Sequence, residues 1–159
     1  MAKFLILLAL CVLLPAYVSA VRPLKFPFVV HGKVFCDTCQ LGFETPASTY
    51  IAGAKVRIVC RNRDSLETVF SCDAVTDKSG SYSVTVAYDH DDQICESVLI
   101  SSPQEHCAKV LSGREKAPVF LTSNNGINSN DRFANNLGFV RDAALAGCTK
   151  IKKLYEEEV

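Results

Sequence analysis

The chain has 159 residues, 48% of them hydrophobic, and its 17 basic and 17 acidic side chains give a formal net charge of zero. This length suits a single domain, and the balanced charge argues against nucleic acid as a partner. The chain has eight cysteines, which raises the question of whether it folds in a reducing or an oxidising compartment.

The first twenty residues are typical of a secretory signal peptide. Lys3 supplies a positive N-terminal end, Phe4 to Leu14 is an unbroken apolar run, and Val18 to Ala20 is a small-residue cleavage site. The apolar run is too short to cross a bilayer, and no later run is longer. We therefore expect a signal peptide over 1–20, and a secreted single domain over 21–159 with no membrane segment.

Alternating apolar residues predict a first strand from Phe28 to Cys36. Phe28, Val30 and Val34 share its apolar face, while His31 and Lys33 lie on the polar face. No carboxylate or second histidine stands at a supporting spacing, so a solvent-exposed histidine is favoured over a metal ligand at His31.

A loop over 40–51 leads to the next two predicted strands, 52–60 and 66–72. In the second of these, Leu66, Phe70 and Cys72 share one side. Cys72 therefore has apolar neighbours, and a buried, unreactive thiol is the expected state.

A turn over 76–82 follows, because Asp77 can cap it and Gly80 can adopt a positive φ. The next strand covers 82–86, with Tyr82 facing inward. Residues 89–92 then place three aspartates around His90. A calcium loop requires oxygens spread over a longer turn with a glycine, so an exposed polar connection is favoured here.

The remaining apolar runs are shorter. Strands are predicted over 95–100, 118–122 and 137–140. In the first of these Glu96 is in phase with Val98, so the pattern does not decide which face is buried. A helical turn over 142–146 is expected to stop at Gly147, and Ile151, Leu154 and Tyr155 share a helical face. Seven short runs separated by turn residues predict an all-β, antiparallel seven-stranded sandwich or barrel with a short C-terminal helix.

The cysteines admit several interpretations. Cys11 leaves with the signal peptide, so six of the remaining seven can pair, and six cysteines allow fifteen pairings. Cys36 and Cys39, two residues apart, could form a redox motif, a zinc site or structural disulfides. Redox motifs sit at a helix N-terminus and zinc sites need a second close ligand pair, so structural disulfides are favoured and no metal is expected.

The run from Gly32 to Cys39 is similar to the signature Gly-x-Val-Tyr-Cys-Asp-x-Cys-Arg of the olive-pollen major allergen and extensin-like family. Further landmarks of that family follow in the same order across nearly the whole mature chain: Gly42-Phe43-Glu44-Thr45, Gly53-Ala54, Cys60, Asp89-His90, Cys95-Glu96, Ser101-Ser102, Cys107, Leu137-Gly138-Phe139 and Cys148. The resemblance implies the bridges Cys36–Cys107, Cys39–Cys148 and Cys60–Cys95. Cys72 has no counterpart in that scheme and is left as a free thiol, or as a site of pairing between chains.

By the same resemblance the chain is expected to be a secreted, non-enzymatic pollen protein with a part in hydration, germination or tube growth, and an allergen. No nucleophile–base pair or phosphate-binding loop can be placed, and no cofactor is expected. The N-linked glycan of some relatives should be absent, because Asn128-Ser129-Asn130 fails as a sequon at its third position.

Two other functions compete with this one. A binding module would use the loops 40–51 and 123–136 to contact wall polysaccharide or a cell-surface protein, because loops on a rigid sheet commonly carry recognition. An oxidoreductase would use Cys36 and Cys39. The chain is expected to be a monomer.

Overall fold

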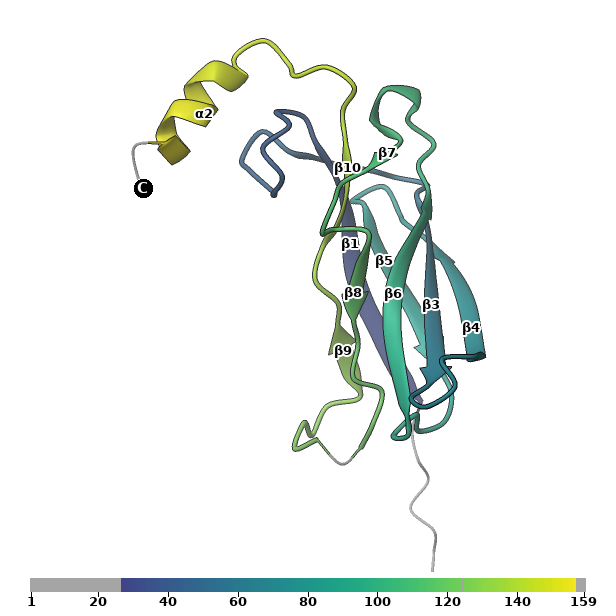
Figure 1. Ribbon diagram of the computed structural model, residues 1–159. Helices are drawn as coiled ribbons and strands as arrows, with labels where there is room; N and C mark the ends of the chain where they lie inside the picture. Colours follow the sequence, from purple (N-terminus) through teal and green to yellow (C-terminus); the bar gives the residue numbers. More distant parts are fainter. Residues whose placement is uncertain (1–26, 124, 157–159) are drawn as a thin grey trace, which may run out of the picture.

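The computed structural model describes residues 27–123 and 125–156, so the predicted signal peptide lies outside the described residues. Two β-sheets pack face to face, and a short helix extends from one end (Figure 1). None of the helices in these ranges has the length and apolar content that a bilayer crossing requires. The elements are β1 (Phe28–Asp37), β2 (Thr49–Tyr50), β3 (Lys55–Asn62), β4 (Thr68–Val75), β5 (Ser81–Val86), β6 (Gln93–Ser101), the 3-10 helix η2 (Glu105–Cys107), β7 (Lys109–Val110), β8 (Lys116–Pro118), β9 (Asp131–Phe133), β10 (Leu137–Val140) and α2 (Cys148–Glu156).

The first sheet is built around β1, which is long enough to serve two sets of neighbours. Its N-terminal half pairs antiparallel with β5 and parallel with β9. Its C-terminal half pairs antiparallel with β2 and parallel with β10. As expected, Phe28, Val30 and Val34 point into the core, so the opposite face of β1 is the outer face of the sheet.

The second sheet has the order β4-β3-β6-β8 and is antiparallel throughout. Val56 and Ile58 of β3 are fully buried against the first sheet. On β6 the buried residues alternate as Cys95, Ser97 and Leu99, which identifies the inner face that the sequence left open. Glu96 therefore points outward.

The all-β fold of two sheets with a C-terminal helix is confirmed, but two details of the prediction were wrong. The described residues contain ten strands rather than seven, because pairs such as Thr49–Tyr50 and Lys109–Val110 are too short to show a period. The pairing is not wholly antiparallel, since β9 and β10 return beside β1 in its own direction. Pairing direction depends on where the chain returns, which a local pattern does not record.

Two local predictions were also wrong. Leu66 lies outside β4 with φ of 57° and is 63% exposed, because it ends a tight turn in which its N–H donates to the Asn62 carbonyl. Residues 142–146 are not helical. The helix begins at Cys148, after Gly147 with φ of 96°, so this glycine precedes the helix instead of ending it.

Gly32 allows the two sheets to be joined by a hydrogen bond through the core. A Cβ at this position would collide with the Tyr82 ring. Without one, the Tyr82 hydroxyl reaches Ser97 Oγ of the opposite sheet at 2.6 Å. Burial raises the pKa of Tyr82, so the phenol remains protonated and is able to donate.

Candidate functional site

A groove of about 630 Å³ lies on the outer face of the first sheet. Its floor is β1, where His31 and Lys33 point outward, and β5 adds Ser81 and Ser83 directly opposite them. Phe133 lies on the β9 side of β1. Tyr50 and Phe133 pair with opposite edges of β1, so the groove crosses this strand diagonally.

Phe133 forms the wall on the β9 side. Its ring stacks on His31, with the ring centroids 5.3 Å apart, and the residue is nevertheless 78% exposed. His31 Nε2 lies 2.9 Å from Asp131 Oδ1 and donates to it, because a carboxylate can only accept. The bond from His31 is the main cause that lowers the pKa of Asp131, followed by one from Ser129. The imidazole is thus oriented by a carboxylate and supports the phenyl ring.

Tyr50 forms the opposite wall and is tied to the far side through Glu44. The Tyr50 hydroxyl donates to Glu44 Oε1 at 2.5 Å, and Asn136 Nδ2 donates to Glu44 Oε2 at 2.6 Å. The hydrogen bond to Glu44 raises the pKa of Tyr50. Lys33 Nζ lies 4.7 Å from the centroid of the Tyr50 ring, a cation–π geometry. Both oxygens of Glu44 are therefore engaged at this end of the groove.

The β4–β5 turn braces Tyr50 from below. Asp77 Oδ1 accepts from the Ser79 hydroxyl and from the backbone N–H groups of Ser81 and Ser79, and these hydrogen bonds, that of the hydroxyl foremost, lower the pKa of this carboxyl. Gly80 adopts φ of 72°, and a Cβ there would lie 2.5 Å from Tyr50 Cβ. Only glycine permits this close approach.

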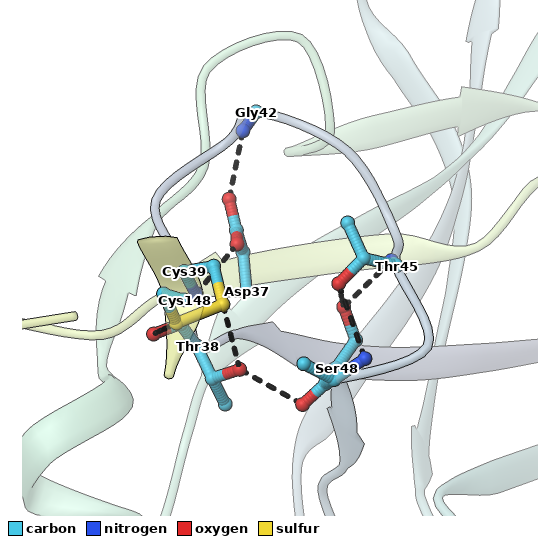
Figure 2. Close-up of a disulfide and its surroundings, with 8 residues drawn as sticks. Asp37, Thr38, Cys39, Gly42, Thr45, Ser48 and Cys148 are labelled. Carbon is cyan, nitrogen blue, oxygen red and sulfur yellow. Dashed lines mark hydrogen bonds between the residues drawn. A yellow bond between two sulfur atoms is a disulfide. The ribbon is translucent and has the colours of Figure 1, made fainter. Parts of the chain in front are cut away.

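The loop 37–48, which precedes Tyr50, is organised by a buried carboxylate. Asp37 is fully buried, and its oxygens accept from the Cys39 N–H at 3.1 Å and the Gly42 N–H at 2.8 Å. Figure 2 shows this carboxylate beside the Cys39–Cys148 disulfide, which joins the loop to the start of α2. Thr38 Oγ1 donates to the Ala47 carbonyl at 2.8 Å and closes the loop from within.

The loop 120–131, which precedes Phe133, is organised by a buried arginine. Arg132 is 3% exposed and lies 4.7 Å from the centroid of the Phe28 ring. Its guanidinium donates to four backbone carbonyls of the loop, those of Phe120, Thr122, Ser129 and Asp131. The fork shape of the guanidinium suits several acceptors at once.

The loops 40–51 and 123–136, predicted from sequence as recognition loops, supply opposite walls of this groove. Nothing in the sequence pattern had indicated that His31, Lys33 and Asp131 belong to one site. Asp131 lies 100 positions from His31 along the chain, so no spacing rule could have connected the two. The polar residues on the outer face of the first strand were the available signal.

The structure forms three disulfides within the described residues, and these are the pairs that the resemblance implied: Cys36–Cys107, Cys39–Cys148 and Cys60–Cys95. Cys36 and Cys39 are thus bonded to remote partners, which leaves no dithiol between them. Cys72 carries a free thiol that is half-buried rather than buried, because β4 lies at the edge of its sheet. Burial raises the pKa of Cys72, with a further contribution from Asp73, which disfavours the reactive thiolate.

The Asp89–Asp92 segment is divided between two roles. His90 is buried, with Nδ1 2.8 Å from Gln93 Oε1, and its ring lies near the Cys60–Cys95 bridge. The sulfurs of that bridge are bonded to each other, so they are not available as thiolate ligands. Asp91 instead accepts a hydrogen bond from Thr122. The segment connects β5 to β6 and anchors the loop 120–131.

The fold and the bridges define a small β-sandwich stapled by three disulfides, with a groove between two braced loops. Residues 26–156 match the family model described as "Pollen protein Ole e 1 like", and the chain belongs to this family. The resemblance noted in the sequence is thereby confirmed.

Relatives of this family span nearly the whole chain. The chain is 44% identical to the anther-specific protein LAT52 of Solanum lycopersicum, over 93% of this chain and 91% of the relative. It is 43% identical to the pollen allergen Che a 1 of Chenopodium album, over 96% and 91%. The crystal structure of the major plantain pollen allergen Pla l 1 superposes with a TM-score of 0.70 at 28% identity, and covers 77% of this chain and 99% of that one.

Proposed function

We propose that the protein is a secreted, non-enzymatic pollen protein that binds cell-wall polysaccharide through the groove and acts during pollen hydration, germination or tube growth. The names of the relatives, an anther-specific protein and pollen allergens, support the pollen assignment. Three long-range disulfides suit an oxidising secretory route, in agreement with the predicted signal peptide.

The single observation that carries the ligand assignment is the exposed ring of Phe133 above a polar floor. The Phe133 ring is 78% exposed, so its apolar surface is in contact with water. Contact with a ligand that covers this surface would be favourable. The faces of a sugar ring carry C–H groups, which pack against the negative face of an aromatic ring. Ser81, Ser83 and Asn136 line the same groove and can hydrogen-bond sugar hydroxyls.

The geometry of the groove supports a binding function over a catalytic one. Ser83 lies opposite His31 across the β1–β5 pair, but no hydrogen bond joins its hydroxyl to the imidazole in the described structure. His31 instead uses Nε2 to bind Asp131 and stacks on Phe133. An activated serine requires a base within hydrogen-bond reach.

The test is retention on immobilised wall polysaccharides, with pectin, xyloglucan, arabinogalactan and β-glucan as separate ligands. We expect the wild type to bind at least one of them and Phe133→Ala to bind it about tenfold more weakly, which corresponds to the loss of one aromatic contact of about 1.4 kcal/mol. The matched control is Tyr88→Ala, since Tyr88 is 83% exposed but does not line the groove. Wild-type protein that binds none of the four, or equal retention of both variants, would contradict the proposal.

A cell-surface protein is the second candidate partner, favoured by an apolar patch beside the groove. Phe120, Ile127 and Phe133 line a common hollow and are 67%, 47% and 78% exposed. Contiguous exposed apolar side chains mark protein-binding surfaces. Phe120→Ala separates the candidates, because it should weaken capture of pollen-tube surface proteins and leave polysaccharide retention unchanged.

A further inference from the structure

This inference rests on the proposed polysaccharide-binding function and concerns the charge of the ligand. Lys33 is the lysine among the residues that line the groove, and it makes no ion pair with a described carboxylate. Its ammonium lies over the Tyr50 ring. The ring attracts the cation electrostatically, but it does not replace an oxygen acceptor. The Lys33 ammonium therefore keeps N–H donors available at the groove.

The carboxylates around Lys33 are already satisfied by other donors. Both oxygens of Glu44 accept, from Tyr50 and Asn136. Asp77 accepts from Ser79 and Ser81, and the charge of Lys33 is the last and smallest of the effects that lower the pKa of Asp77. Asp131, next to the Phe133 wall, accepts from His31 and Ser129. The groove thus offers a cation that makes no ion pair, while the carboxylates near it already accept hydrogen bonds from donors of the protein.

We propose that the groove binds an acidic polysaccharide, with a uronic-acid carboxylate at Lys33 Nζ and a sugar ring against Phe133. Phe133 pairs in register with His31, two residues before Lys33 on β1. The backbone positions of Phe133 and Lys33 are therefore about 7 Å apart along the direction of β1, at about 3.3 Å per residue. The two side chains are reached by neighbouring units of an extended chain, so an oligomer is the expected ligand rather than a free sugar.

An alternative role for Lys33 is a purely structural one, in which the ammonium braces Tyr50. This role predicts that replacing Lys33 alters the stability of the protein and lowers the affinity for every ligand equally. A carboxylate-binding role predicts an effect that is confined to acidic ligands. The effect should also depend on ionic strength, because salt weakens the attraction between exposed charges, with a Debye length of about 10 Å at 0.1 M. The two roles are therefore separable by the choice of ligand.

The experiment titrates the protein with de-esterified oligogalacturonate and with the fully methyl-esterified form of the same oligomer, by calorimetry at low and high salt. We expect the acid form to bind about tenfold more tightly at low salt, with this preference decreasing as salt rises. Lys33→Met should abolish the preference without weakening the ester, and Lys33→Arg should retain it. Lys55→Met is the matched control, since it removes an exposed lysine of the second sheet.

Each outcome bears on one proposal or on both. Equal binding of acid and ester, or a Lys33→Met variant that keeps the preference, would overturn the acidic ligand while leaving polysaccharide binding intact. Binding of neither form, together with no retention on neutral polysaccharides, would overturn the proposed function as well. A Lys33→Met variant with a lower unfolding midpoint and uniformly weaker binding would assign the residue to structure and overturn the carboxylate contact.

Discussion

The loops 37–48 and 120–131 lead into opposite walls of the groove, and they are held by opposite chemistries. In the first loop, the buried Asp37 carboxylate accepts hydrogen bonds from backbone N–H groups, and a disulfide connects the loop to α2. In the second loop, the buried Arg132 guanidinium donates hydrogen bonds to backbone carbonyls, and the described part of the loop contains no disulfide. Figure 1 places these loops toward opposite ends of the sandwich.

The two loops should therefore respond differently when their anchoring residues are substituted. A disulfide stabilises mainly by restricting the unfolded chain, so its removal affects the whole domain. A buried guanidinium acts only in the folded state, where its loss leaves carbonyls without donors. The first loop is therefore coupled to global stability, and the second to local order beside Phe133.

The largest expected effect comes from opening the Cys39–Cys148 bridge. It spans 109 residues, and the double variant Cys39→Ala/Cys148→Ala should lower the free energy of unfolding by about 5 kcal/mol by the loop-closure estimate. Urea unfolding under non-reducing conditions measures this loss. Cys72→Ala removes an unpaired thiol instead, and should change the midpoint far less. Equal losses in both variants would show that the bridge does not restrict the unfolded chain.

Arg132→Lys should have the next largest effect, about 3 kcal/mol, because lysine keeps the charge but cannot reach several carbonyls at once. Hydrogen exchange should accelerate within 120–131 and not within 37–48. Arg57→Lys is the control, since the Arg57–Asp73 ion pair lies on the solvent-exposed surface and its loss should change stability far less. Faster exchange in both loops would contradict the independence of the two anchors.

Gly80→Ala should cost about 2 kcal/mol and displace Tyr50 from the groove wall. Part of this cost is the positive φ, and part is the collision with Tyr50. Gly113→Ala separates the two parts, because Gly113 has φ of 77° but a Cβ there would meet no atom within 4 Å. It should cost about 1 kcal/mol. Equal unfolding midpoints for the two variants would mean that Tyr50 adjusts freely.

The smallest expected effect is a pH dependence at Asp131. Its pKa is lowered in the folded protein, chiefly by His31, so this carboxylate contributes stability above its unfolded pKa near 4 and loses it as pH falls through the folded value. The difference in urea midpoint between wild type and Asp131→Asn should therefore be present in mildly acidic buffer and shrink below about pH 4. A difference that stays constant over this range would show that the carboxylate charge is not involved.

Much of the fold could be predicted from local pattern. Alternation correctly identified the inner face of β1, and Asp77 with Gly80 identified the β4–β5 turn. The free state of Cys72 in the structure follows from the six-cysteine scheme, although its partial exposure does not. The loops 40–51 and 123–136 were predicted from composition as candidates for recognition, without any indication that they line the same groove.

Local pattern was sufficient to assign the inward face of β1, because burial along a strand follows its two-residue period. Three features came from the folded chain alone: β9 and β10 run parallel to β1, His31 binds Asp131, and Lys33 lies over Tyr50. These contacts join residues that are far apart along the chain or on different strands. They depend on how the whole chain folds back on itself, and a periodic pattern within one segment carries no record of that path.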